Sequence, residues 1–244
     1  MTHRNLPYWI ALLCLPLLGL PARAADNELT AQEKQEGYVL LFNGKDLDGF
    51  RSHPKRGYHK WFVQDCVITL TPATPEKDPN FEPYPLWTVD DYENFVLKVD
   101  FHTGPDPENG HSSVILRVAG KPDIRPQPAL EVNLFGPARK LGYFCTGAFR
   151  YGIKAPAKLA VKPAGEWNSL VATVNKQQIV VVLNDVEVNR LDLSEWTTLG
   201  KRPDGSAHLL PMALKDMPAK SAIGFRDDYG IPIWLKNIKL KPIK

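Results

Sequence analysis

The chain lacks most of the motifs that mark common enzyme classes. Its 244 residues include only three cysteines, and they contain no glycine-rich phosphate loop, no HExxH helix and no nucleophile elbow. The histidines fall in no metal-ligand spacing. Basic and acidic residues nearly balance, with a formal net charge of +3, so the composition gives no support for binding to nucleic acid or to an anionic membrane.

The first 24 residues have the pattern of a secretory signal peptide. Arg4 precedes an apolar run over 8–20, and small residues around Ala24 provide a cleavage site. The run is too short and too interrupted by proline for a transmembrane helix, so we expect a secreted or periplasmic protein without a membrane anchor. Cleavage after Ala24 would lower the net charge from +3 to +1 by removing Arg4 and Arg23. It would leave Cys66 and Cys145, either as a disulfide or as free thiols.

The remaining sequence predicts an all-β protein. Short β-type runs are bounded by Pro, Gly, Asn and Asp, and they leave little room for helices, which favours a β-sandwich or jelly roll. We expect an N-terminal segment over 25–36, with a Thr30–Glu33 capping box, and one domain over 37–244. The expected strands span 38–42, 61–70, 95–103, 113–118, 129–135, 167–174, 178–183, 186–193, 221–226 and 233–240.

Polar residues interrupt two of these apolar strands. Glu131 and Asn133 alternate with Leu130, Val132 and Leu134 and therefore occupy the other face of their strand. Arg117 shares a face with Ser113 and Ile115 and, if the two strands are neighbours, approaches Glu131 across them. One interpretation is an ion pair on a solvated sheet, which contributes a few tenths of a kcal/mol. The other is a functional surface.

Loop residues leave a similar choice. Tyr143 and Tyr229 are placed to stack on sugar rings, although each also suits ordinary loop packing. The adjacent Asp227 and Asp228 follow the strand at 221–226, where they suit either a turn or the binding of a cation or of sugar hydroxyls.

Several stretches, in this order, resemble the 3-keto-disaccharide hydrolase domain family. They are GYVLLFNGKDLDGF, WFVQDCVITL, YENFVLKVDF, GHSSVILR, ALEVNLFG, TGAFRYG, KPAGEWNSLVATV, IVVVLNDVEV and AIGFRDDYGIPIWLKNIKL, which together cover about residues 37 to 241. The resemblance implies a jelly roll of the concanavalin A-like lectin and glucanase type, a β-sandwich of two curved antiparallel sheets. It also implies that Arg117 and Glu131 project from the concave sheet, with Asp227 near the same cleft.

The chain departs from the family pattern around this site. His111 stands where the family has Asn, Ser113 where it has Gly, and Asn133 where it has Gln. The family's Gln-Asp-His-Gly corresponds to a run from Arg226 to Gly230 that contains no histidine.

The resemblance implies an enzyme that cleaves 3-keto-glycosides or disaccharides. A ketone at C3 acidifies the C2 proton, so a base can remove it, the glycosidic oxygen at C1 can leave, and water can add to the enone. We expect Glu131 to be the base and Arg117 the anchor for the enolate. Asp227 or a divalent cation would act on the leaving side, and His111 would be a proton shuttle.

Asn133, Tyr143, Asp228 and Tyr229 are the expected substrate contacts of this enzyme. The alternatives are a non-catalytic carbohydrate-binding protein that uses the same face, and a conventional glycosidase with paired carboxylates.

Overall fold

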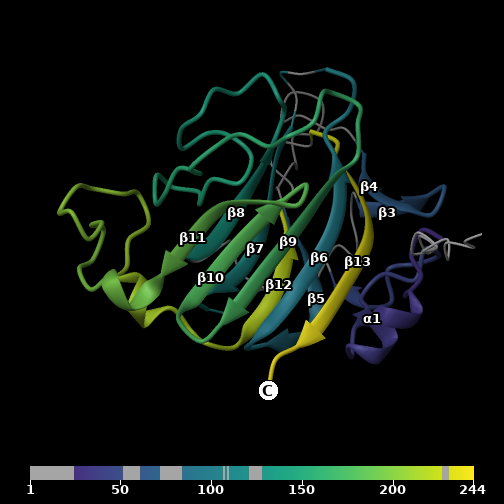
Figure 1. Cartoon of the computed structure of the whole chain (residues 1–244), viewed down its shortest axis with the longest axis horizontal. Coiled ribbons are helices and arrows are strands. Elements are labelled where there is room, and N and C mark those ends of the chain that lie inside the picture. Colours follow the sequence, from purple (N-terminus) through teal and green to yellow (C-terminus); the bar gives the residue numbers. More distant parts are fainter. Residues whose placement is uncertain are drawn as a thin grey trace, which may run out of the picture.

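The chain folds as two antiparallel sheets that lie face to face (Figure 1). The computed structural model describes residues 25–51, 61–71, 84–106, 108, 110–120, 128–226 and 231–244. The predicted all-β sandwich is therefore confirmed. The predicted signal peptide over 1–24 lies outside the described residues and stays a prediction.

The larger sheet contains eight strands and faces the viewer in Figure 1. Seven strands follow one another across it in a single path, and β1 pairs with β13 beside that path. In spatial order these are β11 (Val186–Asp192), β10 (Gln178–Leu183), β9 (Asn168–Asn175), β6 (Phe95–His102), β13 (Trp234–Pro242), β4 (Val67–Leu70) and β3 (Trp61–Gln64), with β1 (Val39–Leu40) on β13.

The smaller sheet has five strands and lies behind the larger one in the same view. All its neighbouring strands are antiparallel. Their order is β2 (Phe50–Arg51), β5 (Leu86–Tyr92), β12 (Ser221–Phe225), β7 (His111–Val118) and β8 (Ala129–Phe135).

Strand β6 shows why the two sheets pack together. Its residues alternate between buried and half-buried, and Phe95, Leu97, Val99 and Phe101 are all fully buried between the sheets. Burying each of these side chains stabilises the fold by about 1.5–3 kcal/mol. The opposite face of β6 carries polar side chains on the outside of the larger sheet.

The smaller sheet is buried on both faces over β12, β7 and β8. Every residue of β8 and β12 is buried, as is every residue of β7 after His111. A separate apolar cluster covers part of its outer face, and it contains Trp87, Ile115 and Ala222. Gly224 lies beneath Trp87, where an added Cβ would meet the indole at 2.6 Å. The outer face of this sheet is therefore not the solvated surface that one interpretation of the sequence assumed.

A segment of the chain between β8 and β9 forms backbone hydrogen bonds along β8. The N–H of Asn133 donates to the carbonyl of Ala148 at 2.9 Å, and the carbonyl of Asn133 accepts from the N–H of Gly147 at 3.0 Å. The N–H of Arg150 donates to the carbonyl of Glu131 at 2.9 Å. The Arg150–Tyr151 segment is thereby fixed beside the polar residues of β8.

Turn chemistry explains several local features. The β10–β11 turn has Asn184 and Asp185 in the left-handed region, as predicted, with φ of 50° and 65°. Asp65 and Cys66 also have positive φ, 51° and 62°, so the expected single strand at 61–70 is in fact the hairpin of β3 and β4. Strands β2 and β5 were not among the expected strands.

The N-terminal segment packs against the larger sheet. Helix α1 (Ala31–Gln35) begins at the predicted capping box. The Thr30 hydroxyl accepts from the N–H of Glu33, and the Glu33 carboxylate accepts from the N–H of Thr30. The Glu33 carboxylate accepts from Lys98 at 2.9 Å and from Lys239 at 2.7 Å. Two short 3-10 helices, η1 (Leu193–Glu195) and η2 (Leu214–Asp216), lie in the excursion between β11 and β12.

The two cysteines among the described residues are both free thiols. Cys66 is exposed in the β3–β4 turn, whereas Cys145 is buried. Burial raises the pKa of the Cys145 thiol above its usual range. Within the described part of the chain, no helix is long and apolar enough to cross a membrane.

Candidate functional site

Glu131 is the centre of a buried polar cluster on the outer face of the smaller sheet. Its side chain is fully buried in the middle of β8. Arg226, directly after β12, forms two hydrogen bonds to it, from Nε to Oε2 at 2.7 Å and from Nη2 to Oε1. Ser113 on β7 donates to Oε2 at 2.5 Å. A buried carboxylate requires such partners, because each unpaired charge would cost several kcal/mol.

Tyr151 completes the cluster from the β8–β9 connection. Its hydroxyl donates to Glu131 Oε1 at 3.1 Å and accepts from Arg226 Nη2 at 3.1 Å. Burial and the negative charge of Glu131 raise the pKa of this phenol to about 12, so Tyr151 is protonated at neutral pH. Unlike Glu131, Tyr151 is only half-buried, so it joins the carboxylate to the solvent side of the cluster.

Arg150 adds a second cation to the same carboxylate. Its Nε lies 3.9 Å from Glu131 Oε2, and 19% of its side chain is exposed. The guanidinium also lies 5.7 Å from the centre of the Tyr151 ring. The cluster therefore combines one carboxylate, two guanidinium groups and a neutral phenol, an arrangement that suits the binding or stabilisation of developing negative charge.

The expected approach of Arg117 to Glu131 is wrong. A β-bulge lies between Ile115 and Arg117, so Ile115 pairs with Glu131 while Arg117 pairs with Leu130. The extra residue, Leu116, turns Arg117 away from the Glu131 face. Arg117 instead reaches the turn between β9 and β10, where Nη2 donates to the carbonyl of Lys176 at 2.5 Å. Burial lowers the pKa of Arg117, although the charge of Glu93 opposes that effect.

Two other predicted residues lie on the same face of the smaller sheet as Glu131, and a third, Tyr143, contacts one of them. Asn133 and His111 share its face of the sheet, opposite Ser113 and Phe135 respectively. Asn133 donates from Nδ2 to the carbonyl of Tyr143 at 3.1 Å. The imidazole of His111 stacks on Phe135 at 4.6 Å, and its Nε2 lies 3.3 Å from Arg139 Nη2.

The remaining predicted residues are Asp227, Asp228 and Tyr229. They lie outside the described residues, so their part in the site stays a prediction. Among the residues that are described, no three His, Cys, Asp or Glu side chains come together as metal ligands would. The divalent cation on the leaving side likewise stays a prediction.

Two fully buried residues on this face have a polar atom without a hydrogen-bond partner among the described residues, namely Oδ1 of Asn133 and Nε1 of Trp87. Both residues are at most 1% exposed. An unsatisfied buried polar atom costs about 1–3 kcal/mol, so such atoms are uncommon away from binding sites. One acceptor and one donor are thus available on the same face as Glu131.

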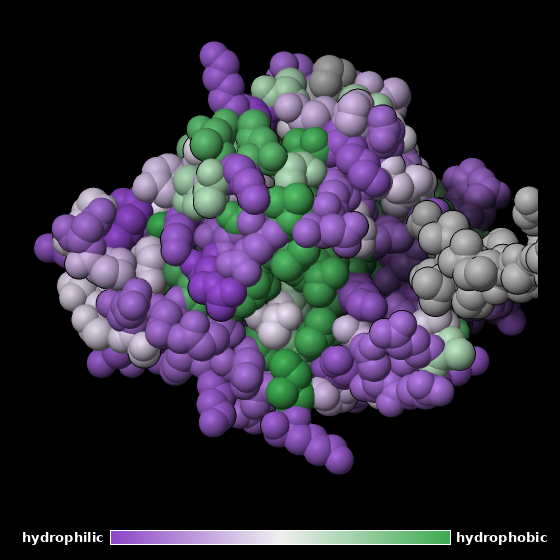
Figure 2. Space-filling model, in the orientation of Figure 1, coloured by the Kyte–Doolittle hydropathy of each residue, from purple (hydrophilic) through white to green (hydrophobic). Residues whose placement is uncertain are grey.

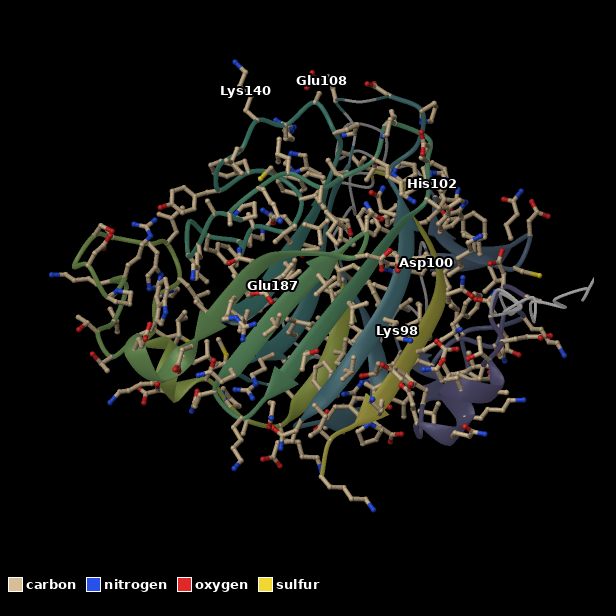
Figure 3. The ribbon with its side chains drawn as sticks, viewed as in Figure 1. Lys98, Asp100, His102, Glu108, Lys140 and Glu187 are labelled. Atoms are coloured by element: carbon tan, nitrogen blue, oxygen red, sulfur yellow. The ribbon has the colours of Figure 1, made fainter. Side chains whose placement is uncertain are left out.

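A cavity of about 470 Å³ lies on the outer face of the other sheet. Figure 3 shows Lys98, Asp100 and His102 in succession along β6 on that side, and the first two line the cavity. Four of its charged groups are already hydrogen-bonded, since Glu33 accepts from Lys98 and Lys239, and Asp100 accepts from Asn237 at 2.8 Å. The N-terminal segment forms part of the wall of this cavity, opposite the larger sheet.

The same face is largely polar. Figure 2 shows hydrophilic residues around a hydrophobic strip that runs down its middle. The half-buried Val171, Val180 and Val182 lie on this outer face of β9 and β10. The described residues of this face do not gather two guanidinium groups and a phenol around a buried carboxylate, as the cluster at Glu131 does.

Sequence reasoning missed Arg226, Tyr151 and Arg150. Regular alternation in SAIGFR places Arg226 on the face of Ala222 and Gly224, opposite Ile223 and Phe225, so this signal was available. Tyr151 and Arg150 lie in an irregular connection without periodicity. No pattern in that stretch indicates which way their side chains point.

Comparison with known proteins identifies relatives over most of the chain. The sequence pattern of a domain family described as 3-keto-alpha-glucoside-1,2-lyase-like matches residues 37–241. A 3-keto-disaccharide hydrolase of Bacteroides thetaiotaomicron is 26% identical over 227 residues, which cover 84% of this chain and 78% of the relative.

Solved structures agree with this assignment. A candidate glycosyl hydrolase of Parabacteroides distasonis is 26% identical, with a TM-score of 0.71 over 90% of this chain and 100% of that one. A second one from the same organism is 28% identical, with a TM-score of 0.68 over 84% and 99% of the two chains. A Bacillus subtilis protein of galectin-like fold is 14% identical, with a TM-score of 0.50 over 79% and 88%, and it supports the lectin-like sandwich only.

Proposed function

Because the chain belongs to the 3-keto-α-glucoside-1,2-lyase-like domain family, we propose that it cleaves the glycosidic bond of 3-keto-glycosides or 3-keto-disaccharides. The observation that carries this proposal is the hydrogen bond from the half-buried Tyr151 to the fully buried Glu131, with Arg226 and Arg150 beside them. The signal-like sequence of residues 1–24 supports a further proposal, that the enzyme is exported.

Glu131 receives the C2 proton through Tyr151 in this proposal. The carboxylate is fully buried, whereas the phenol is half-buried and within hydrogen-bonding distance of it. As the C2–H bond breaks, the Tyr151 oxygen takes the proton and the phenolic proton passes to Glu131 Oε1. The resulting negative charge on the C3 oxygen is stabilised by a nearby guanidinium, for which the partly exposed Arg150 is our candidate.

Elimination and hydration complete the reaction. The C1–O bond breaks as the enolate collapses to the enone, and the departing oxygen takes a proton. Water then adds to C1 and a proton returns to C2, so the net change is hydrolysis. His111, on the same face as Glu131, is our candidate donor to the leaving oxygen, with Asp227 or a cation as the alternative. Asn133 and Tyr143, joined by their hydrogen bond, would hold sugar hydroxyls, together with Asp228 and Tyr229.

A specific observation favours a second candidate function. Both oxygens of Glu131 are already occupied by protein donors, as in many purely structural buried ion pairs. On that interpretation the cluster stiffens a non-catalytic carbohydrate-binding surface. This function predicts that a sugar binds without any product being formed.

The test is to incubate the purified protein with a 3-keto-glucoside and with the same glucoside before oxidation, with and without a chelator. We expect an aglycone to be released from the oxidised substrate alone. Tyr151→Phe and Glu131→Gln should each lower kcat by about 100-fold or more, because each interrupts proton transfer. Cleavage of the unoxidised glucoside would instead establish a conventional glycosidase, and saturable binding without product would establish the binding function.

Matched controls separate chemistry from damage to the fold. Tyr38→Phe removes a phenol near α1, where Lys98 lies 4.3 Å from the ring, on the other side of the molecule from Glu131. Glu187→Gln removes a carboxylate from an exposed ion pair with Arg190. Both control variants should retain full activity, and undiminished turnover in Tyr151→Phe would remove the phenol from the mechanism.

A further inference from the structure

The backbone at Tyr151 has a conformation that few residues of its kind adopt. Its φ is 63°, in the left-handed region, and the next residue, Gly152, has a φ of 69°. For a bulky residue other than glycine this geometry is unfavourable and persists only when the surroundings enforce it. The conformation directs the phenol to Glu131, so the groups that enforce it also position the phenol.

Arg202, from a different part of the chain, binds the two residues that follow Tyr151. It lies in the excursion between β11 and β12, and its guanidinium donates to two successive carbonyls, those of Gly152 and Ile153, the second at 3.2 Å from Nε. The N–H of Leu209, in the same excursion, donates to the carbonyl of Tyr151 at 2.8 Å. Three consecutive carbonyls, of residues 151–153, are therefore held by one neighbouring loop.

The guanidinium of Arg202 is itself held in place. Its Nη1 donates to Ser206 Oγ at 2.9 Å and to the carbonyl of Ala207 at 2.5 Å. Its backbone N–H donates to the carbonyl of Ser206 at 2.8 Å, so a local turn fixes both ends of the residue. A planar guanidinium that is already held in this way loses little conformational entropy when it binds carbonyls.

The same guanidinium also contacts the other loop residue of the site. It lies 4.7 Å from the centre of the Tyr143 ring, a cation–π geometry. The Tyr143 carbonyl in turn accepts the hydrogen bond from Asn133. Arg202 therefore joins the two stretches of the β8–β9 connection that border the Glu131 cluster.

We propose that Arg202 is a positioning residue, which holds Tyr151 in its left-handed conformation and so keeps its hydroxyl on Glu131. This inference rests on the proposed function for the consequence in catalysis, but the geometric claim stands apart from it. Nothing in the sequence joins Arg202 to the site, because the two are about fifty positions apart in the chain.

The experiment follows the ionisation of Tyr151 by NMR of protein labelled in the tyrosine rings, with the signal assigned by Tyr151→Phe. Because Glu131 and burial hold the pKa of this phenol at about 12, it should remain protonated in the parent protein at about pH 11. In Arg202→Ala the released ring should ionise near pH 10, like an exposed tyrosine. Arg202→Lys should behave like Arg202→Ala, because an ammonium cannot form the fork that binds two carbonyls.

Activity gives the second readout. Arg202→Ala should lower kcat on the 3-keto-glucoside by about tenfold or more, since the phenol is displaced. KM should change less than kcat, because Tyr143 loses its cation–π contact but keeps its hydrogen bond from Asn133. Arg190→Ala, which removes an exposed arginine paired with Glu187, should change neither readout. A folded Arg202→Ala protein whose Tyr151 still resists ionisation at about pH 11 would overturn the inference.

The two claims fail in different ways. If the parent protein does not cleave the 3-keto-glucoside, the proposed function falls, while the NMR titration still decides the role of Arg202. If the parent protein cleaves it and Arg202→Ala leaves both the titration and kcat unchanged, the proposed function stands and the role of Arg202 falls.

Discussion

At the scale of single residues, both oxygens of Glu131 accept hydrogen bonds from protein groups. The carboxylate therefore holds its neighbours in place, and it is also our candidate proton acceptor. Arg226, Ser113 and Tyr151 converge on it from a strand end, a neighbouring strand and a loop. None of these contacts is available to Arg117, the partner expected from the sequence. The identity of the partners is therefore what distinguishes this site from a simple cross-strand ion pair.

Removal of the negative charge should destabilise the protein. Glu131→Gln leaves the buried Arg226 without its counter-ion, and breaking a buried pair in this way costs about 3–5 kcal/mol. Urea denaturation at neutral pH measures this change in the free energy of unfolding. Glu187→Gln, in an exposed pair, should change it by less than about 1 kcal/mol, and equal effects of the two substitutions would contradict the account.

Ser113 offers a finer test at the same carboxylate. Ser113→Ala removes one hydrogen bond to a buried charged group while the size of the residue hardly changes. The expected loss of stability is about 1.5–3 kcal/mol, which thermal unfolding detects. Ser112→Ala is the matched control, because the neighbouring Ser112 hydroxyl donates to the carbonyl of Arg226, an uncharged group. The effect at Ser113 should exceed the effect at Ser112.

At the scale of elements, the β-bulge at Leu116 decides which residues meet. It reverses the alternation of β7, so Arg117 faces the space between the sheets and caps the β9–β10 turn at Lys176. We therefore expect Arg117→Ala to lower stability by about 2–4 kcal/mol through the lost contact and the cavity that it leaves. Its kcat on the 3-keto-glucoside at a temperature well below unfolding should remain that of the parent protein, and a large loss of kcat would contradict this placement.

Much of the fold could be predicted from alternation and turn chemistry. Phe95 to Phe101 alternate with polar residues and form β6, and Asn184-Asp185 forms the predicted turn. The bulge at Leu116 could not be predicted, because 114–116 are three successive apolar residues without an alternation that would show a change of face. Tyr151 could not be predicted either, since its position depends on Arg202, a contact between distant loops that local sequence does not encode.

At the scale of the whole molecule, the two sheets carry different polar clusters on their outer faces. The Glu131 cluster lies on the smaller sheet, and the Glu33 cluster on the larger sheet fastens the N-terminal segment through Lys98 and Lys239. Burial alone would raise the pKa of Glu33, but hydrogen bonds from Lys239 and Lys98 outweigh it and lower the pKa to about 2. The Glu33 contacts therefore depend on pH.

The sign of this dependence follows from the lowered pKa. Glu33 binds its proton more weakly in the folded protein than in the unfolded chain, so its contribution is present above about pH 4.5 and is lost as the pH falls towards 2. We expect residues 25–36 to become sensitive to an acid-active protease in that range. Glu33→Gln should be cleaved in the same segment at neutral pH by a protease that is active there. Equal protection of the segment in both proteins at every pH would contradict this role for Glu33.

The most direct test of the central claim is the cleavage of a 3-keto-glucoside that carries deuterium at C2. If Tyr151 and Glu131 remove that proton, the deuterated substrate should be cleaved more slowly than the ordinary one. The recovered substrate in heavy water should also gain deuterium at C2, and Tyr151→Phe should suppress this exchange. Cleavage at the same rate for both substrates, without exchange at C2, would contradict proton abstraction at this site.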